Sequence, residues 1–263
     1  MDFFEILSTY TAISLFSLIL FSFIAGYIDA VVGGGGLIVI PMLMINFPNA
    51  NLPTLFGTNK ISALSGTTVA AYQYSKRIQF DFKLLLIVSF FAFAASFFGA
   101  KTVSYIDANA LKPVILFILI LIAIYTYIKK DLGSVETKQL SQRKEIIYGS
   151  LIGLFVGFYD GFFGPGTGSF FVLGFVVLLG FEFVKASAYS KIINCITNIS
   201  ALIVFIRQGN YILEIAVIMA VSNIFGNILG SKMALKKGNG LVRIIFLIIV
   251  SLLIFRYGYD VFY

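Results

Sequence analysis

Residues 26–36 read GYIDAVVGGGG and residues 157–168 read GFYDGFFGPGTG, so an aspartate followed by a glycine cluster occurs twice in this chain. The separation between Asp29 and Asp160 equals that between Gly26 and Gly157, which open the two stretches. Each cluster is followed directly by an apolar run. Since glycine lets the backbone leave a helix, the clusters indicate two broken helices at equivalent places.

The repeat extends far beyond these motifs at the same separation, which we call the repeat offset. The further matched pairs are Gly33 with Gly164, Gly35 with Gly166, Lys60 with Lys191, Ile61 with Ile192, Gly99 with Gly230 and Lys101 with Lys232. No insertion is needed between residues 26 and 101. We interpret this as an internal duplication, with a first transmembrane repeat over 1–128, an exposed cytoplasmic linker over 129–145 and a second repeat over 146–263.

The composition indicates a membrane protein. Hydrophobic residues make up 59% of the 263 residues and charged residues only 12%, against about 25% charged residues in a soluble domain. With 14 Tyr and no Trp, tyrosine must supply most of the aromatic belt at the interfaces. The net charge of +7 could suggest nucleic acid, but the basic residues lie in short loops, so we expect no nucleic-acid partner.

Apolar runs predict an all-α integral membrane protein, a polytopic helical bundle of about eight to ten segments in a lipid bilayer. They cover residues 11–32, 36–46, 56–75, 82–104, 109–128, 146–163, 168–180, 188–206, 211–233 and 241–262. A full crossing takes about 20 residues, so the runs 36–46 and 168–180 are either short crossings or re-entrant hairpins. The first run is expected to be a retained span, because Met1–Tyr10 lacks the basic start of a signal peptide.

The distribution of basic residues predicts inverted repeats. With five segments in each half, 13 of the 19 basic residues fall on one side and four on the other, while Lys60 and Lys191 lie within apolar segments. With four crossings in each half the bias disappears. Since positive loops face the cytoplasm, the five-segment arrangement is favoured, with the linker inside and both termini outside.

Inverted repeats with broken helices are an architecture of secondary transporters. The N-terminus of a half-helix presents free N–H groups and a partial positive charge, which suits an anion. The expected anion-binding backbone consists of Gly33, Gly34, Gly35, Gly36, Gly164, Gly166, Thr167 and Gly168. Thr167 and Ser169 are expected to cap the half-helix that follows. The alternative is close helix packing at small residues.

Lys60 and Lys191 each open an apolar segment within a polar cluster. Helical spacing places Asn194 and Asn198 on the same face as Lys191, and Asn59 directly precedes Lys60. Ionisable residues inside a membrane are costly and tend to be functional, so these five residues are predicted to bind the anion. The alternative is that the lysines extend to the interface.

Asp29 and Asp160 lie one turn before the glycine breaks and could orient the lysines, bind a cation or couple a proton. They also raise the possibility of an intramembrane aspartyl protease, which the missing Gly-x-Gly-Asp run disfavours. The chain has no histidine, no zinc spacing and no Walker A motif, so no metal, cofactor or catalytic residue is expected. The single cysteine, Cys195, is expected to be a core residue.

The motifs at 26–37, 58–60 and 157–169 resemble those of the TauE/SafE sulfite exporter family. The resemblance covers nearly the whole chain, which is most similar to the family's probable membrane transporter subgroup. The resemblance implies a bacterial inner-membrane transporter, associated with sulfite, sulfonates and related organosulfur anions.

The leading hypothesis is therefore a secondary transporter of a small anion, sulfite or an organosulfonate, that works by alternating access, with a homodimer as one possible assembly. An anion channel and, below it, an intramembrane enzyme are the alternatives.

Overall fold

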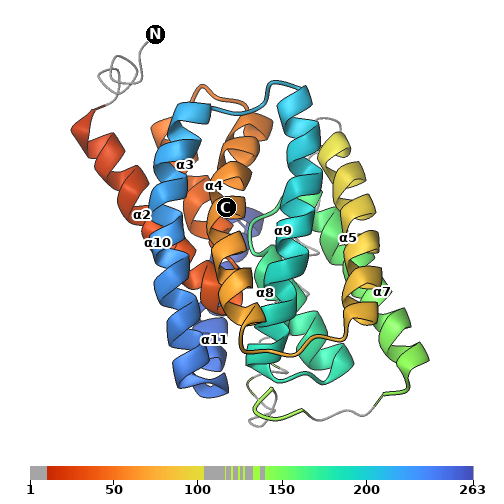
Figure 1. Cartoon of the computed structure of the whole chain (residues 1–263). Helices are drawn as coiled ribbons and strands as arrows, with labels where there is room; N and C mark the ends of the chain where they lie inside the picture. The colour runs from red at the N-terminus through yellow and green to blue at the C-terminus, as the bar shows by residue number, and fades with distance from the viewer. Residues whose placement is uncertain are drawn as a thin grey trace.

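The computed structural model describes residues 11–103, 133–136 and 140–262, with the single positions 116, 120, 124 and 127 between them. Every regular element in these ranges is a helix (Figure 1). The elements are α2 (Ala12–Val32), α3 (Gly36–Asn46), α4 (Leu52–Ser75), α5 (Phe82–Thr102), α7 (Gln142–Phe162), α8 (Thr167–Gly174), the π-helix η2 (Phe175–Leu179), α9 (Phe183–Arg207), α10 (Leu213–Lys237) and α11 (Asn239–Phe262). The predicted run 109–128 and most of the linker lie outside the described residues.

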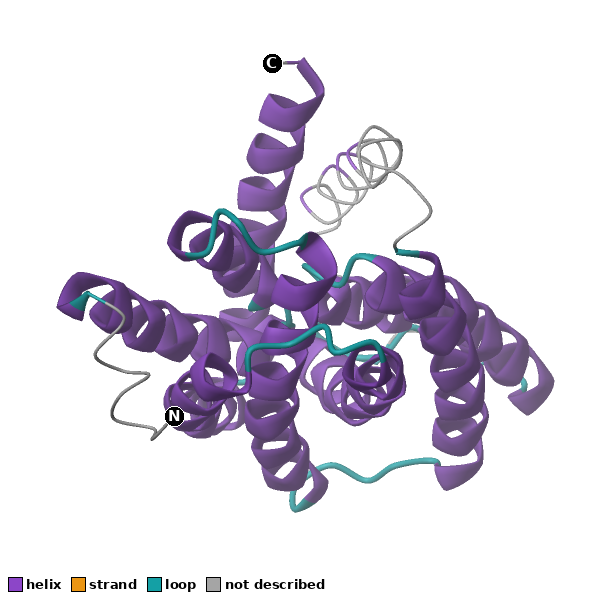
Figure 2. Cartoon of the chain, turned by 90° about the horizontal axis from the view of Figure 1, so that it is seen from above, coloured by secondary structure: helices purple, strands orange, loops and turns teal. Residues whose placement is uncertain are grey.

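Five of these helices, α2, α5, α7, α9 and α10, are long and apolar enough to cross a membrane. With 21 to 25 residues each, they measure roughly 31 to 38 Å at 1.5 Å per residue, against a hydrocarbon core of about 30 Å. The polytopic helical bundle predicted from the sequence is thus confirmed. In Figure 2 the last helix, which ends at the C-terminus, lies at the edge of the bundle.

The two short runs form short helices next to each break. α3 has 11 residues, which is roughly 16 Å, and α8 with η2 reaches roughly 20 Å, so neither can cross the bilayer alone. α3 packs against α2, and the α3–α4 connection lies at the upper end in Figure 1. These short helices are therefore too short to be independent crossings, and each follows a glycine break at the end of a longer helix.

Three long helices, α4, α7 and α9, begin at least four residues before their apolar runs. α4 begins at Leu52 because Asn51 caps it, accepting from the N–H of Thr54 at 2.9 Å. α9 begins at Phe183, after Glu182, and α7 begins at Gln142, inside the stretch assigned to the linker. Helix starts carry polar residues that satisfy free N–H groups, so an apolar run misses the first turn.

The helix starts follow a regular relation between the two halves of the chain. α3, α4 and α5 begin at positions 36, 52 and 82, and α8, α9 and α10 begin at 167, 183 and 213, each exactly one repeat offset later. Packing follows the same relation, because α5 packs along α7 just as α10 packs along α2. In Figure 1, α4 runs from the upper to the lower end of the bundle and α9 runs in the opposite direction. These two helices, which the repeat offset relates, therefore run in opposite directions.

Equivalent glycines let the two equivalent helix pairs approach closely. A Cβ atom on Gly99 would lie 2.2 Å from the carbonyl oxygen of Phe158, and one on Gly230 would lie 2.3 Å from that of Tyr27. Small residues at such crossings allow backbone contact between membrane helices. These matched glycines therefore serve helix packing.

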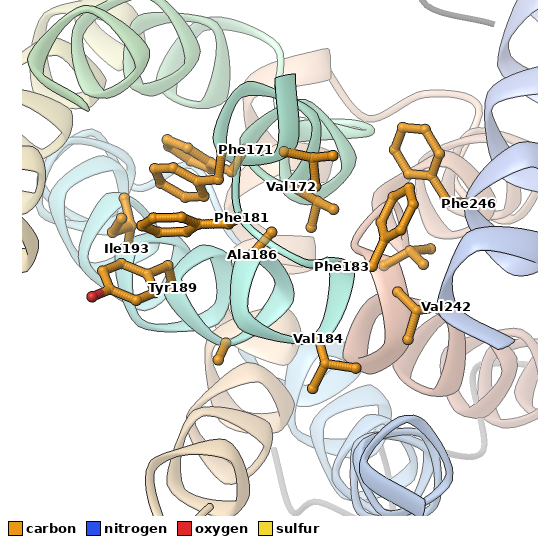
Figure 3. Close-up of a cluster of buried hydrophobic side chains, with 14 of the residues drawn as sticks. Phe171, Val172, Phe181, Phe183, Val184, Ala186, Tyr189, Ile193, Val242 and Phe246 are labelled. Carbon is orange, nitrogen blue, oxygen red and sulfur yellow. The ribbon is translucent and has the colours of Figure 1, made fainter. Parts of the chain in front are cut away.

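A cluster of buried aromatic and aliphatic side chains holds the second break in place (Figure 3). Phe175 and Phe181 flank Tyr189, with ring centroids at 5.9 and 5.1 Å from the tyrosine ring. Phe183 packs against Phe246 of α11 at 5.5 Å. The cluster joins η2, α9 and α11, so it fixes the elements that follow the break.

Candidate functional site

Both breaks use glycine in a left-handed backbone conformation at equivalent positions. Gly33 has φ +79° and Gly164 has φ +90°. Their N–H groups donate to the carbonyls of Asp29 and Tyr159, at 2.8 and 3.1 Å. Left-handed geometry after a helix end favours glycine because a Cβ atom would be strained there. Each aspartate therefore lies in the last turn of the helix that ends at its glycine break.

The first ion pair crosses between the repeats. Lys60 of α4 places its Nζ 2.9 Å from Oδ2 of Asp160 and donates to Oδ1 of Asn198 at 3.1 Å. Asn198 in turn donates to Oδ1 of Asn194 at 3.2 Å. The side chains of Lys60 and Asp160 are only 5% and 3% exposed. The lysine thus points into the protein, and the alternative of a lysine extended to the interface is wrong.

The second ion pair is the repeat-related counterpart of the first. Lys191 Nζ lies 3.3 Å from Oδ2 of Asp29, and the hydroxyl of Thr67 donates to the same carboxylate oxygen at 3.0 Å. The repeat offset relates Lys60 to Lys191, Asp29 to Asp160 and Thr67 to Asn198. Each half of the chain therefore supplies a lysine to the aspartate of the other half.

The lysines of the two pairs differ in their surroundings. Lys191 is completely buried, and within the described chain its ammonium donates no hydrogen bond. Lys60, by contrast, lines a small cavity at the breaks. The pseudosymmetry of the sequence is thus broken in this conformation, in which only the first lysine reaches the cavity.

The cavity lies between the breaks and has a volume of about 30 Å³. One water molecule needs roughly 10 to 15 Å³ of such space, so the cavity holds two waters or one small ion. Its lining consists of Asp29, Gly34, Gly36, Phe56, Asn59, Lys60, Ala63, Asp160, Phe163, Gly164, Gly166, Thr167, Gly168, Asn194 and Asn198. Twelve of these fifteen residues are candidates named from the sequence.

Backbone N–H groups at the starts of two helices border the cavity. Gly36 is the first residue of α3, and Gly168 lies in the first turn of α8. Within the described chain, their N–H groups donate to no backbone carbonyl. Such free groups at a helix start carry the positive end of the helix dipole, and both glycines line the cavity together with Lys60.

Three candidates do not line the cavity: Gly33, Gly35 and Lys191. A Cβ atom on Gly33 would lie 2.2 Å from the Cα of Gly168, and one on Gly35 would lie 2.6 Å from the carbonyl oxygen of Ala25. Close packing, the alternative stated above, therefore explains these two glycines. Lys191 lies behind the cavity because Asp29 holds it.

The expected capping of α8 by side chains is wrong. The N-cap residue is Gly166, and no side chain caps the helix. The hydroxyl of Thr167 donates to the Gly164 carbonyl at 2.6 Å, while Ser169 donates to the carbonyls of Val32 and Gly33 at 3.2 and 3.1 Å. Ser169 thus satisfies free carbonyls at the end of α2 and ties the two breaks together.

Three lining residues, Phe56, Ala63 and Phe163, were missed from the sequence. Phe56 stands one helical turn before Lys60, and its ring meets that of Phe163 edge-on at 5.8 Å. Ala63 is the repeat counterpart of Asn194. The repeat offset and the helical spacing from Lys60 could have identified Ala63 and Phe56, respectively.

The family model for the sulfite exporter TauE/SafE matches residues 18–257. The chain belongs to the TauE/SafE family. A TauE/SafE model that covers nearly all of the described helices confirms the resemblance drawn from the glycine motifs.

Named relatives of this TauE/SafE protein are described as membrane transporters. It is 37% identical to the "Probable membrane transporter protein ORF9" of Sinorhizobium sp over 88% of this chain and 87% of that protein. It is 34% identical to a "Probable membrane transporter protein" of Haemophilus influenzae over 90% of this chain and 92% of that protein. The "Probable membrane transporter protein YdhB" of Bacillus subtilis is 28% identical, over 82% and 88%.

No solved structure matches the chain. Family and relatives together identify a multi-pass membrane transporter of the TauE/SafE family, and these names indicate a transporter rather than an enzyme.

Proposed function

We propose that this TauE/SafE protein is a secondary transporter that carries a small anion, sulfite or an organosulfonate, through the cavity at the two breaks. The observation that carries the proposal is a buried lysine, Lys60, in the lining of a cavity that Gly36 and Gly168, two residues at helix starts, also line. A cation and free N–H donors in a site shielded from water bind anions strongly. Asn59, Asn194 and Asn198 add side-chain amides for an oxyanion.

The charges of the site imply a role for the aspartates. Two lysines and two aspartates give a formal net charge of zero, so an added monoanion would leave a net negative charge inside the membrane. Such a charge is costly there. Protonation of Asp160 or Asp29 as the anion binds restores neutrality and frees a lysine for the anion. The aspartates therefore orient the lysines in the empty site and couple the anion to a proton.

The proposed duplication supports alternating access as the mechanism. With the two repeats inverted, each places its lysine on the other repeat's aspartate, so both ion pairs lie across the boundary that moves when the repeats rock. In the opposite state, Lys191 would line the cavity and Lys60 would be occluded behind Asp160. The two lysines would then exchange roles between the states.

The membrane in question is the inner membrane of a bacterium, with the linker in the cytoplasm and both termini outside. Connections α4–α5, α8–α9 and α10–α11 lie at the lower end of the bundle in Figure 1. Ten described basic residues belong to this end: Lys76, Arg77, Lys83, Arg143, Lys144, Lys185, Lys232, Lys236, Lys237 and Arg243. Lys101 and Arg207 belong to the other end, so the positive-inside rule supports this orientation.

The structure favours a carrier over the two alternatives. The cavity holds only about 30 Å³, and the Lys60–Asp160 pair forms part of its wall, which suits a site that must open and close rather than a continuous channel. An aspartyl protease needs two carboxylates that share a proton, whereas Asp29 and Asp160 are each paired with a lysine.

A thermal-shift screen of detergent-purified protein tests the proposal. The ligands are sulfite, sulfate, thiosulfate, taurine, sulfoacetate and methanesulfonate, because a ligand of the folded state raises the melting temperature. We expect one sulfur anion to stabilise the protein and its effect to vanish in Lys60→Met and in Ala63→Leu, which fills the cavity without a change of charge. Lys83→Met, on an exposed residue outside the site, is the control. If no sulfur anion stabilises the folded protein, the substrate assignment fails.

A further inference from the structure

A second, larger cavity lies at the basic end of the bundle, away from the breaks. It has a volume of about 1040 Å³ and opens between the lower parts of α4 and α10, close to the starts of α9 and α11. None of its lining residues lines the cavity at the breaks. It is therefore a distinct site, with dimensions well above those that a small anion needs.

Four basic residues line this cavity: Lys76 and Arg77 at the end of α4, and Lys232 and Lys236 near the end of α10. All four are exposed. Within the described chain, none of them forms an ion pair. The ammonium of Lys76 lies 4.1 Å from the centroid of the Tyr72 ring, which holds it at the cavity.

The acidic content of the cavity does not balance these charges. Glu182 is the only carboxylate in its lining, as far as the chain is described, and it accepts a hydrogen bond from the amide of Asn239 at 2.9 Å. Four positive charges thus face one carboxylate that already has a partner. The cavity consequently attracts an anionic group.

An apolar surface leads along α10 to the basic residues. Val221, Phe225 and Leu229 follow one another at intervals of four residues and are 54%, 59% and 51% exposed. Four-residue spacing places them on one face of the helix, and Lys232 and Lys236 continue along it. On α4, the ring of Tyr72 is 60% exposed beside Lys76. A molecule that fits this surface has apolar chains along the helix and an anionic head at its end.

We propose that this second cavity, called the basic crevice below, binds an anionic phospholipid. The phosphate of the headgroup would contact Lys76, Arg77, Lys232 and Lys236. An acyl chain would lie along Val221, Phe225 and Leu229. Basic pockets between membrane helices on the cytoplasmic side suit acidic lipid headgroups. The apolar surface favours a lipid over a free anion, because a free anion has no apolar chain to pack against it. The lipid would join α4, which carries Lys60, to α10, which packs on α2.

The experiment measures the melting temperature of delipidated, detergent-purified protein with phosphatidylglycerol or phosphatidylcholine of the same acyl chains, and with glycerol 3-phosphate as the free headgroup. We expect phosphatidylglycerol to raise the melting temperature by several degrees, and the other two to have little effect. Lys232→Gln/Lys236→Gln should weaken the response to phosphatidylglycerol roughly tenfold or more in lipid concentration. Both lysines are exposed, so the melting temperature without lipid should stay unchanged.

Lys83→Gln/Lys144→Gln is the matched control, because it removes two exposed charges from the same end of the bundle outside the crevice. This variant should keep the full response. An equal loss in both variants would overturn the proposal in favour of general surface charge. A response to glycerol 3-phosphate that Lys232→Gln/Lys236→Gln abolishes would overturn it in favour of a water-filled anion site. An equal response to both lipids would overturn it as well.

Discussion

At the scale of single residues, two lysine–aspartate ion pairs join the two halves of the chain. Lys60 and Asp160 are both buried and come from different repeats. A buried charge that loses its partner is strongly destabilising, whereas the loss of both charges is often tolerated. The pair therefore has a structural effect that can be measured apart from transport.

Lys60→Met should lower the free energy of unfolding by about 3–5 kcal/mol, because the carboxylate of Asp160 stays buried without its cation. Lys60→Met/Asp160→Leu should recover most of that loss. Thermal unfolding in detergent measures both variants, since 1 kcal/mol corresponds to roughly 2–4 °C for a chain of this size. Equal losses in the single and the double variant would show that the pair contributes nothing through its charges.

Asp160→Asn should change how anion affinity depends on pH. If binding takes up one proton, the affinity of the wild-type protein for methanesulfonate rises as the pH falls, by up to about tenfold per pH unit. Methanesulfonate keeps its charge throughout, so the proton must come to the protein. In Asp160→Asn the site has a net positive charge without protonation, so affinity at neutral pH should increase and depend less on pH.

Isothermal titration at several pH values measures this dependence, with Asp81→Asn as a control outside the site. Asp81 caps α5 through the N–H groups of Lys83 and Leu84, so its variant should keep the pH dependence of the wild-type protein. A wild-type affinity that does not vary with pH would exclude proton coupling while leaving anion binding itself intact.

At the scale of the elements, the sequence predicts the position of a helix wherever local composition determines it. Apolar runs predicted the long helices, and the repeat offset predicted equivalent starts for α3 and α8. The partner of Lys60 was not predictable, because pairing with Asp160 rather than Asp29 depends on how the repeats dock. The burial of Lys191 behind the cavity could not be predicted either. Lys60 and Lys191 are equivalent in the sequence, and only the packed structure decides which of them lines the cavity.

Gly230→Ala should destabilise the protein through the α2–α10 pair. The new Cβ atom would lie 2.3 Å from the carbonyl oxygen of Tyr27 and 2.9 Å from the Cβ of Ala30, so the helices must move apart, at a cost of about 1–3 kcal/mol. Gly240→Ala in α11 is the control, because nothing lies within 4 Å of its Cβ position. Thermal unfolding should show a loss for the first variant and no loss for the second.

At the scale of the whole molecule, the two ends of the bundle differ in charge, and this asymmetry predicts how the protein sits in the membrane. The lower end in Figure 1 carries the start of α7, and the upper end carries the end of α9. Lys144 and Arg207 mark these two ends and are both exposed. A cysteine at either position should therefore react from one side of the membrane only.

In a Cys195→Ser background, Arg207→Cys should react with a membrane-impermeant maleimide in intact cells, and Lys144→Cys should react only after the inner membrane is made permeable. The physical reason is the excess of basic residues at the end that holds Lys144, which the positive-inside rule keeps in the cytoplasm. The reverse pattern would place the basic crevice outside, where the cytoplasmic leaflet could not supply its acidic lipid. Labelling of both Lys144→Cys and Arg207→Cys in intact cells would mean that the charge bias does not fix the orientation. The protein would then insert into the membrane in both orientations.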